Sequence, residues 1–292
     1  EYLAAGEWYQ GWDEQVGVRR LPFDHIVGGA PSRSWFMGDF SFDGVPMPFA
    51  RYGTSPGYMV VEFDGSDFVV NFHAAGQPTD RALALSFNTP AFRDWFGTLA
   101  SWQQDPGPAA DAVPPLSLHD LPDVKLHTPA ELAEGVWLTA NFWPGDRHSR
   151  VTARIDDGPA REMTRTQDGE GEAVRAGAEW ADSFAVQRQM TIGRHAIRSG
   201  SGDAHAQGFE VWQGRRFGPV PPQAQLPRML ADSSSHLWRM RLPDDLPEGT
   251  HVITVTATDQ HERVFSDHIV FEIRGQRPFP YWDDSLWQGR AE

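Results

Sequence analysis

The chain has 292 residues, of which 40% are hydrophobic, and a formal net charge of −15 at pH 7. A chain of this length can bury a large core, whereas the acidic balance argues against a nucleic-acid surface, which needs clustered Lys and Arg. Cysteine is absent, which excludes disulfides and thiolate metal sites, and the lack of any apolar run of about 18 residues predicts no transmembrane segment.

Residues 1–20 show no sustained hydrophobic period and predict no regular element. They carry aromatic side chains among glycines, namely Tyr2, Trp8, Tyr9 and Trp12. The chain opens at Glu1 without a methionine, and we interpret it as a fragment or a mature product.

Residues 21–99 predict a subdomain that begins as an antiparallel β-meander. Asp64–Gly65 is a strong hairpin signal, because both residues tolerate the positive φ angles of a tight turn. The strands are expected at Phe23–Val27, Ser34–Phe40, Gly57–Phe63, Phe68–His73 and Ala82–Phe87.

A short helix is expected over Thr89–Leu99, because it places Phe92, Trp95, Phe96 and Leu99 on one face. Residues 100–130 are rich in Pro, Ala and Asp from residue 103 onward and lack alternation, which predicts a linker or an exposed excursion.

Residues 131–275 predict an immunoglobulin-like or fibronectin-like β-sandwich. In Thr250–Thr258 and Val264–Ile273, apolar side chains alternate with polar ones, which indicates a hairpin with one apolar face. Such a face needs a second sheet over it. Further strands are expected at Gly135–Phe142, Ser149–Asp156, Arg161–Arg165 and Leu237–Leu242.

Two further segments complete the prediction. Residues 167–232 form an insertion in the sandwich that is partly helical, with a possible helix over Ala173–Met190, and residues 276–292 form an aromatic C-terminal tail. The predicted fold class is therefore all-β and mainly antiparallel, with a β-meander followed by a sandwich.

Several ordered motifs resemble the C-terminal region of bacterial calcineurin-like phosphoesterases. They are DHIVGGAPSRSWF at residues 24–36, RYGTSPGY at 51–58, FHAAGQPTD at 72–80, ANFWPGD at 140–146, REMTR at 161–165 and HLWRMRLPDDLPEGTHVITVTATD at 236–259. The resemblance implies that a catalytic domain lies upstream, that residues 1–20 are its end or the link to it, and that the protein is exported, its signal lying outside this chain.

The same family implies a divalent metal pair bound by clustered Asp, His and Asn residues. An Asp-x-His motif at Asp203–His205 lies within a Ser/Gly loop, and no Gly-Asn-His or Gly-His-x-His motif is present. We therefore expect no catalytic residue, metal ligand or cofactor in this chain, and we expect the metal pair in the upstream catalytic domain.

Two loops are the best candidates for a functional surface, because in the family the equivalent loops follow the catalytic histidines closely and would border the substrate cleft. Arg33 suits a phosphate or a carboxylate. The alternative is that these are structural loops of a β-domain with a buried Trp35. The candidate residues are Ser32, Arg33, Ser34, Trp35, Thr54 and Tyr58.

Two functions follow from the sequence. The first is an accessory domain that packs against the upstream catalytic domain and shapes the cleft of a dinuclear-metal phosphoester hydrolase. The alternative is an independent carbohydrate- or surface-binding module that uses exposed tryptophans such as Trp102, Trp143, Trp212 and Trp282. His73 and His236 are expected to be packed or hydrogen-bonded rather than metal ligands.

Overall fold

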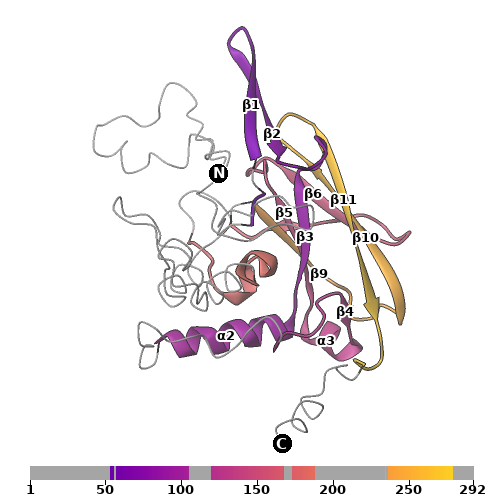
Figure 1. Ribbon diagram of the computed structural model, residues 1–292. Helices are drawn as coiled ribbons and strands as arrows, with labels where there is room; N and C mark the ends of the chain where they lie inside the picture. The colour runs from indigo at the N-terminus through magenta and orange to yellow at the C-terminus, as the bar shows by residue number, and fades with distance from the viewer. Residues whose placement is uncertain are drawn as a thin grey trace, which may run out of the picture.

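The computed structural model describes residues 53–55, 57–104, 120–167, 173–187, 234 and 236–278. These residues form a two-sheet antiparallel sandwich with a projecting hairpin and two α-helices of defined extent (Figure 1). The all-β sandwich prediction is confirmed. The strands expected at Phe23–Val27 and Ser34–Phe40 lie outside the described residues, as do residues 1–20 and the tail beyond residue 278.

The first sheet has five strands in the order β4-β11-β10-β6-β7. Its centre is the predicted C-terminal hairpin, in which Ile253 lies opposite Ile269. β4 is the exception to the antiparallel pattern, since it runs parallel to β11. The bounds are β4 Leu126–His127, β6 Arg150–Ile155, β7 Arg161–Glu162, β10 Gly249–Thr258 and β11 Val264–Ile273.

The second sheet has four strands in the order β3-β5-β9-β8. β9 follows the insertion and precedes the C-terminal hairpin in the chain, yet it pairs with β5 in the opposite sheet. β3, which the sequence predicts within the meander, also pairs with β5 and is therefore a sandwich strand. The bounds are β3 Leu83–Asn88, β5 Trp137–Phe142, β8 Thr164–Arg165 and β9 Leu237–Arg241.

The core lies between the two sheets, and the alternation in the sequence decides which residues enter it. Ile253, Val255 and Ala257 of β10 are fully buried, as the period of two predicts. Leu138 and Phe142 face them from β5 within the same cluster of buried side chains. Excluding these side chains from water is the main favourable contribution to folding.

Two helices lie toward one end of the sandwich (Figure 1). α2 (Pro90–Gln104) begins after Thr89, whose hydroxyl accepts the N–H of Phe92, and it buries the predicted apolar face. It extends to Gln104, further than predicted and into the range expected to be a linker. α3 (Pro129–Glu134) begins with a capping box between Thr128 and Glu131.

Residues 173–187 contain two short helical pieces rather than one long helix. The 3-10 helix η2 (Ala178–Trp180) and the helical turn at 183–187 are separated by Ala181, which is extended with ψ 147°. Gly177, with φ 99°, ends any helix on the other side. The single helix expected over Ala173–Met190 is therefore wrong within this range.

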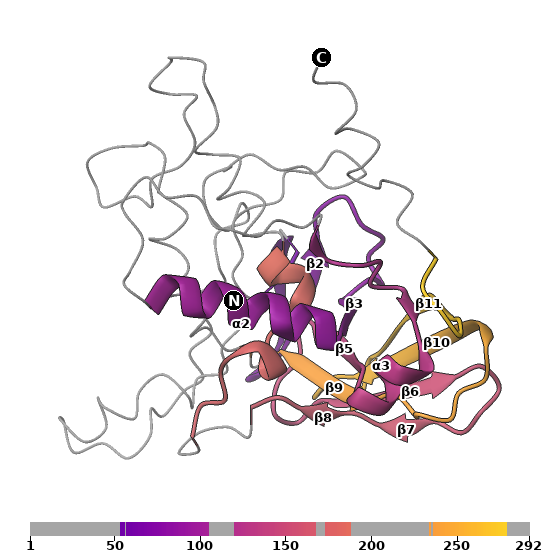
Figure 2. The same ribbon diagram turned by 90° about the horizontal axis from the view of Figure 1, so that it is seen from below.

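The strands β1 (Gly57–Asp64) and β2 (Asp67–Ala74) form the hairpin predicted from Asp64–Gly65. Gly65 has φ 63°, the left-handed conformation that such a turn needs. The hairpin projects beyond one end of the sandwich, on the side away from α2 (Figures 1 and 2).

His127 of β4 is fully buried among aromatic rings in the core. Its ring lies edge-on to Phe87, with centroids 4.8 Å apart, and 5.7 Å from the ring of Phe271. Neither ring nitrogen has a hydrogen-bond partner among the described residues. Burial lowers the pKa of His127 to about 4, so the imidazole is neutral in the folded protein at pH 7.

The variant His127→Phe is expected to resist acid better than the wild type. The unfolded chain binds a proton at His127 below pH ~6.5, but the folded protein does so only near pH 4, so the wild type loses stability as pH falls through this window. The loss from this residue should reach about 2–3 kcal/mol near pH ~4.5.

Urea unfolding of both proteins at about pH 7.5 and pH 4.5 measures this difference. The exposed His268→Phe is the matched control and should keep the wild-type pH dependence. If His127→Phe and the wild type lose the same free energy between the two pH values, the expectation is wrong.

Candidate functional site

The outer face of the four-stranded sheet is polar but buried. On β5 the side chains of Leu138, Ala140 and Phe142 enter the core, so Thr139 and Asn141 point to the opposite face. Both are nevertheless buried, because residues 173–187 cover this face. This interface between a polar sheet face and a covering segment, here called the polar interface, is the first candidate site.

Asp182 is the centre of the polar interface. Its Oδ2 accepts a hydrogen bond of 2.8 Å from the side-chain amide of Asn141. Its Oδ1 accepts the backbone N–H groups of Phe184 and Ala185 at 2.9 and 3.2 Å, which makes Asp182 the N-cap of the helical turn at 183–187. Ser183 also donates its hydroxyl to the carbonyl of Phe87 on β3.

Burial raises the pKa of Asp182, although its hydrogen bonds to Asn141, Ala185 and Phe184 oppose the shift. A buried carboxyl with a raised pKa is a common feature of catalytic sites. Here every contact is also explained by structure, because the carboxyl caps a helical turn and joins it to the sheet. The polar interface is therefore a structural support, and its relevance to function depends on which segments of the chain it holds in place.

The loop predicted to border a cleft starts at the polar interface. A Cβ atom on Gly53 would lie 2.5 Å from Asp182 Oδ2 and 2.8 Å from Asn141 Nδ2, and its φ is 69°. Only glycine fits there, so the chain passes directly over the buried carboxyl. Thr54 is buried beside it, whereas Tyr58, at the start of β1, is half exposed and stacks on His73.

The other candidate cleft residues, Ser32, Arg33, Ser34 and Trp35, lie outside the described residues. Thr54 and Tyr58 come from the same loop and strand but differ in exposure, so Tyr58 is the one that a substrate or a neighbouring domain can reach. That these six residues border a cleft stays a prediction.

Arg239 joins the same sheet face to the covering segment, and sequence reasoning missed it. Its guanidinium carbon lies 4.1 Å from the ring centroid of Trp137 and 3.5 Å from that of Trp180. Glu179 accepts a hydrogen bond from it at 3.1 Å. An arginine between two indoles is a strong cation-π arrangement. The signal was Arg239 itself, a charged residue between the apolar side chains of Trp238 and Met240 in β9.

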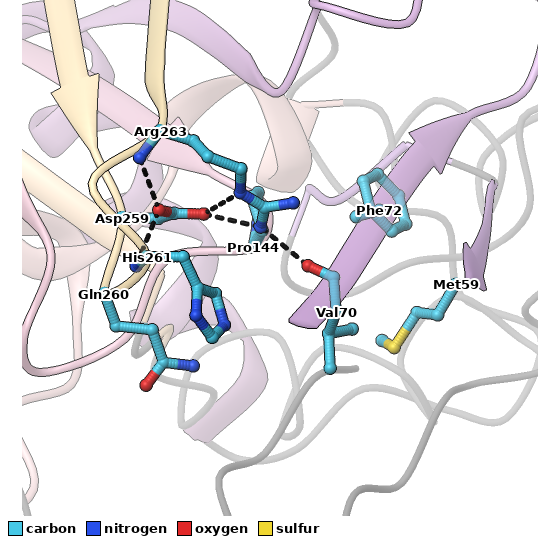
Figure 3. A pocket seen from close by; sticks show the side chains of 8 residues that line it. All are labelled: Met59, Val70, Phe72, Pro144, Asp259, Gln260, His261 and Arg263. Atoms are coloured by element: carbon cyan, nitrogen blue, oxygen red, sulfur yellow. Dashed lines mark hydrogen bonds and ion pairs between the residues drawn. The ribbon is translucent and has the colours of Figure 1, made fainter. Parts of the chain in front are cut away.

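A small pocket lies where the hairpin meets the turn between β10 and β11 (Figure 3). Its cavity of about 10 Å³ has room for about one water, which is too little for a phosphate ester. The ring Nε2 of His261 is buried without a partner among the described residues, and a water there would satisfy it. The lining residues are Met59, Val70, Phe72, Pro144, Asp259, Gln260, His261 and Arg263.

Arg263 clamps the hairpin to the sandwich at this pocket (Figure 3). It pairs with the buried carboxylate of Asp259, with an N–O distance of 2.5 Å. The same guanidinium donates to the backbone carbonyl of Val70 at 2.6 Å and to the side-chain oxygen of Asn71. The spacing of Asp259 and Arg263 across a turn is visible in the sequence, but their contact with β2 is not.

Within the described ranges, no group of three or more His, Asp or Glu side chains is placed to hold a metal ion. Asp203–His205 lies outside these ranges. No described helix is long and apolar enough to span a membrane.

The tryptophans expected to bind sugars are not all exposed. Trp143 is buried and packs edge-on against Phe72, with centroids 5.9 Å apart, so its expected exposure is wrong. Trp102 is half buried, and Trp212 and Trp282 lie outside the described residues. The prediction for His236 is confirmed, since its Nδ1 is 2.7 Å from the carbonyl of Gly145.

Comparison with known families identifies the part of the chain that holds this loop, hairpin and polar interface. The model of the family described as the C terminal of calcineurin-like phosphoesterase matches residues 24–202, which is more than half of the chain. The chain belongs to this family. Its resemblance to that region, expected from the motifs, is thus confirmed. No curated protein and no solved structure matches the chain.

The family match ends before the last three strands, yet these strands complete both sheets of the calcineurin-like phosphoesterase C-terminal region. β9 pairs with β5 and β10 pairs with β6, both of which lie inside the matched range. Residues 236–273 are therefore part of the same folded unit.

The variant Asp182→Ala should destabilise the protein by about 2–4 kcal/mol. It removes the N-cap and leaves the buried amide of Asn141 without the acceptor shown here. Asp182→Asn keeps a capping oxygen and should lose less. Urea unfolding measures both variants, with the exposed Asp94→Ala as the control. A loss below about 0.5 kcal/mol for Asp182→Ala would contradict the role of this carboxyl.

The variant Arg263→Met should loosen the hairpin and destabilise the sandwich by about 2–4 kcal/mol, because it leaves the carboxylate of Asp259 buried without its cation. Hydrogen exchange of β1 and β2, measured by mass spectrometry, should become faster, while exchange in β5 changes less. The exposed Arg154→Met is the control. Unchanged exchange in β2 would show that the clamp does not hold the hairpin.

Proposed function

We propose that this chain is the accessory C-terminal region of a calcineurin-like metallophosphoesterase, and that it packs against the catalytic domain and shapes the cleft in which a phosphoester is hydrolysed. The observation that carries the proposal is the family match, because residues 24–202 contain all six candidate cleft residues and the whole hairpin. In this proposal the catalytic domain precedes the matched region in the same polypeptide.

The geometry of the loop supports a role in positioning. Gly53 is fixed over Asp182 and Asn141, and β2 is fixed by Arg263, so the segment between these two anchors starts and ends on rigid supports. Tyr58 lies on that segment with its ring half exposed. A side chain held in this way can contact a substrate or a partner without a large loss of conformational entropy.

The catalytic metals belong to the other domain in this proposal. A dinuclear phosphoesterase needs several carboxylate, imidazole and amide ligands close together, and the described residues do not provide such a group. In this proposal the divalent metal pair is therefore bound by the catalytic domain, and the described residues supply no ligand to it.

The test compares the full polypeptide with the separate chain of residues 1–292. Hydrolysis of bis-p-nitrophenyl phosphate and p-nitrophenyl phosphate is measured with added Mn²⁺, Fe²⁺ or Zn²⁺, and bound metal is quantified in both proteins. The full polypeptide is expected to bind metal tightly and to turn over substrate, and the separate chain to do neither. Turnover by the separate chain that survives repurification would overturn the proposal.

The same assay tests the shaping of the cleft. In the full polypeptide, Tyr58→Ala should raise KM about 3- to 10-fold with little change in kcat, because it removes binding that is common to substrate and transition state. Tyr58→Phe, which keeps the stacked ring, should have a smaller effect. An unchanged KM for Tyr58→Ala would exclude Tyr58 from the cleft without affecting the assignment of the catalytic domain.

A further inference from the structure

The strand β1 of the projecting hairpin is unusually apolar for an exposed strand. In β1 the exposed fraction is 74% for Phe63, 51% for Tyr58, 38% for Val61 and 37% for Val60. Exposed apolar side chains that gather on one element mark a surface that binds another molecule more often than a surface without a partner. A free strand with such side chains is also prone to aggregate unless something covers it.

The register places apolar residues on one face of the hairpin. Met59 lies opposite Phe72, Val61 opposite Val70 and Phe63 opposite Phe68, and side chains two apart on a strand share a face. The other face is mixed, because Tyr58 lies opposite His73, Val60 opposite Asn71 and Glu62 opposite Val69. One face of the hairpin therefore carries six apolar side chains in three cross-strand pairs.

Only the inner part of this apolar face has a described covering. Phe72 packs against Trp143, and Met59, Val70 and Phe72 line the pocket beside the β10–β11 turn (Figure 3). Beyond it lie Val61, Phe63 and Phe68, which we call the apolar tip. The rings of Phe63 and Phe68 are 6.1 Å apart, so they form one continuous patch.

The apolar tip is held rather than free to collapse onto the body. Arg263 binds Val70 and Asn71 in the middle of β2, and all eight residues of β1 pair with β2. A two-stranded hairpin is only marginally stable alone, so this clamp keeps the tip extended. A surface that is already in its bound shape binds with a smaller entropic cost.

Charged residues around the tip limit what can cover it. Glu62, Asp64 and Asp67 are exposed beside Val61, Phe63 and Phe68, and the chain as a whole carries a net charge of −15. Two tips placed together would bring their carboxylates into repulsion, and an anionic lipid surface would repel them too. The complementary surface is apolar in the centre and edged by Lys or Arg.

We propose that the apolar tip docks into an apolar recess, edged by basic residues, on the catalytic phosphoesterase domain of the same polypeptide. This inference rests on the proposed function, and it names the element through which the two domains meet. The hairpin lies within the family match, and a family described as the C terminal of a phosphoesterase makes the catalytic domain of the same polypeptide the partner that the match favours. Docking of the tip would also fix Tyr58, on the same strand, relative to the catalytic cleft.

Photo-crosslinking of the full polypeptide tests the contact directly. Phe63→p-benzoylphenylalanine should, on irradiation, form crosslinks to residues of the catalytic domain within one polypeptide, identified by mass spectrometry. The control places the same photoreactive residue at Val264, which is 64% exposed on β11, and should give few or no such crosslinks. Crosslinks only between two polypeptides, only within this C-terminal chain, or none at all would overturn the inference.

A second measurement uses the paired variant Val61→Thr with Phe63→Ser, again in the full polypeptide, with Val264→Ser as the matched control. The paired variant should increase hydrogen exchange at the recess of the catalytic domain by about threefold or more, and the control should not. Equal exchange in the paired variant and the wild type would overturn the inference. If the wild-type polypeptide is an active metal-dependent phosphoesterase but Phe63 gives no crosslink to its catalytic domain, only the docking inference fails. If it lacks that activity, the proposed function fails.

Discussion

The fold depends on the burial of both faces of β5. The inner face of this strand is apolar and closes the sandwich core, whereas its outer face carries Thr139 and Asn141, which water would reach in a two-layer protein. Asp182 prevents that exposure, because it accepts a hydrogen bond from Asn141 and caps the helical turn that covers the sheet. The third layer is thus held to the sheet by polar contacts, which are directional and fix one arrangement, and to α2 by the apolar contacts of Ala181 and Val186.

The directional contacts of that layer determine where the candidate cleft loop begins. Gly53 lies against the carboxyl and amide of the polar interface, and the hairpin that follows is tied to the far sheet by Arg263. Two anchors on different sheets therefore hold one segment that is otherwise free of the core. In the accessory role that we propose, this held and exposed segment is the part that would contact the catalytic domain.

Local patterns in the sequence predicted the elements whose signals are local. The alternation of Ile253, Val255 and Ala257 identified the buried face of β10, Asp64–Gly65 identified the hairpin, and the spacing of Phe92, Trp95 and Phe96 identified α2. Contacts between segments that are distant in the sequence could not be predicted. The residue pattern of a strand shows which side chains lie on each face, but it does not show which strand pairs with it. β9 in the opposite sheet, Arg239 between two indoles and the contact of Arg263 with Val70 all depend on such distant segments. For the candidate site, the motifs found the loop and the hairpin, whereas the carboxyl beneath the loop was not identified.

The pairing of β5 with β9 and of β6 with β10 has a consequence for how the protein reaches its native state. Asn141 pairs with Leu237, and Ile155 pairs with Ile253. Each sheet can therefore be completed only after strands about 100 residues later in the chain have been synthesised. Until then β5 and β6 have open edges and an uncovered apolar face, which are hazards for a chain still on the ribosome. Folding should therefore be a late and slow event of high contact order, completed only when the last strands of the chain are available.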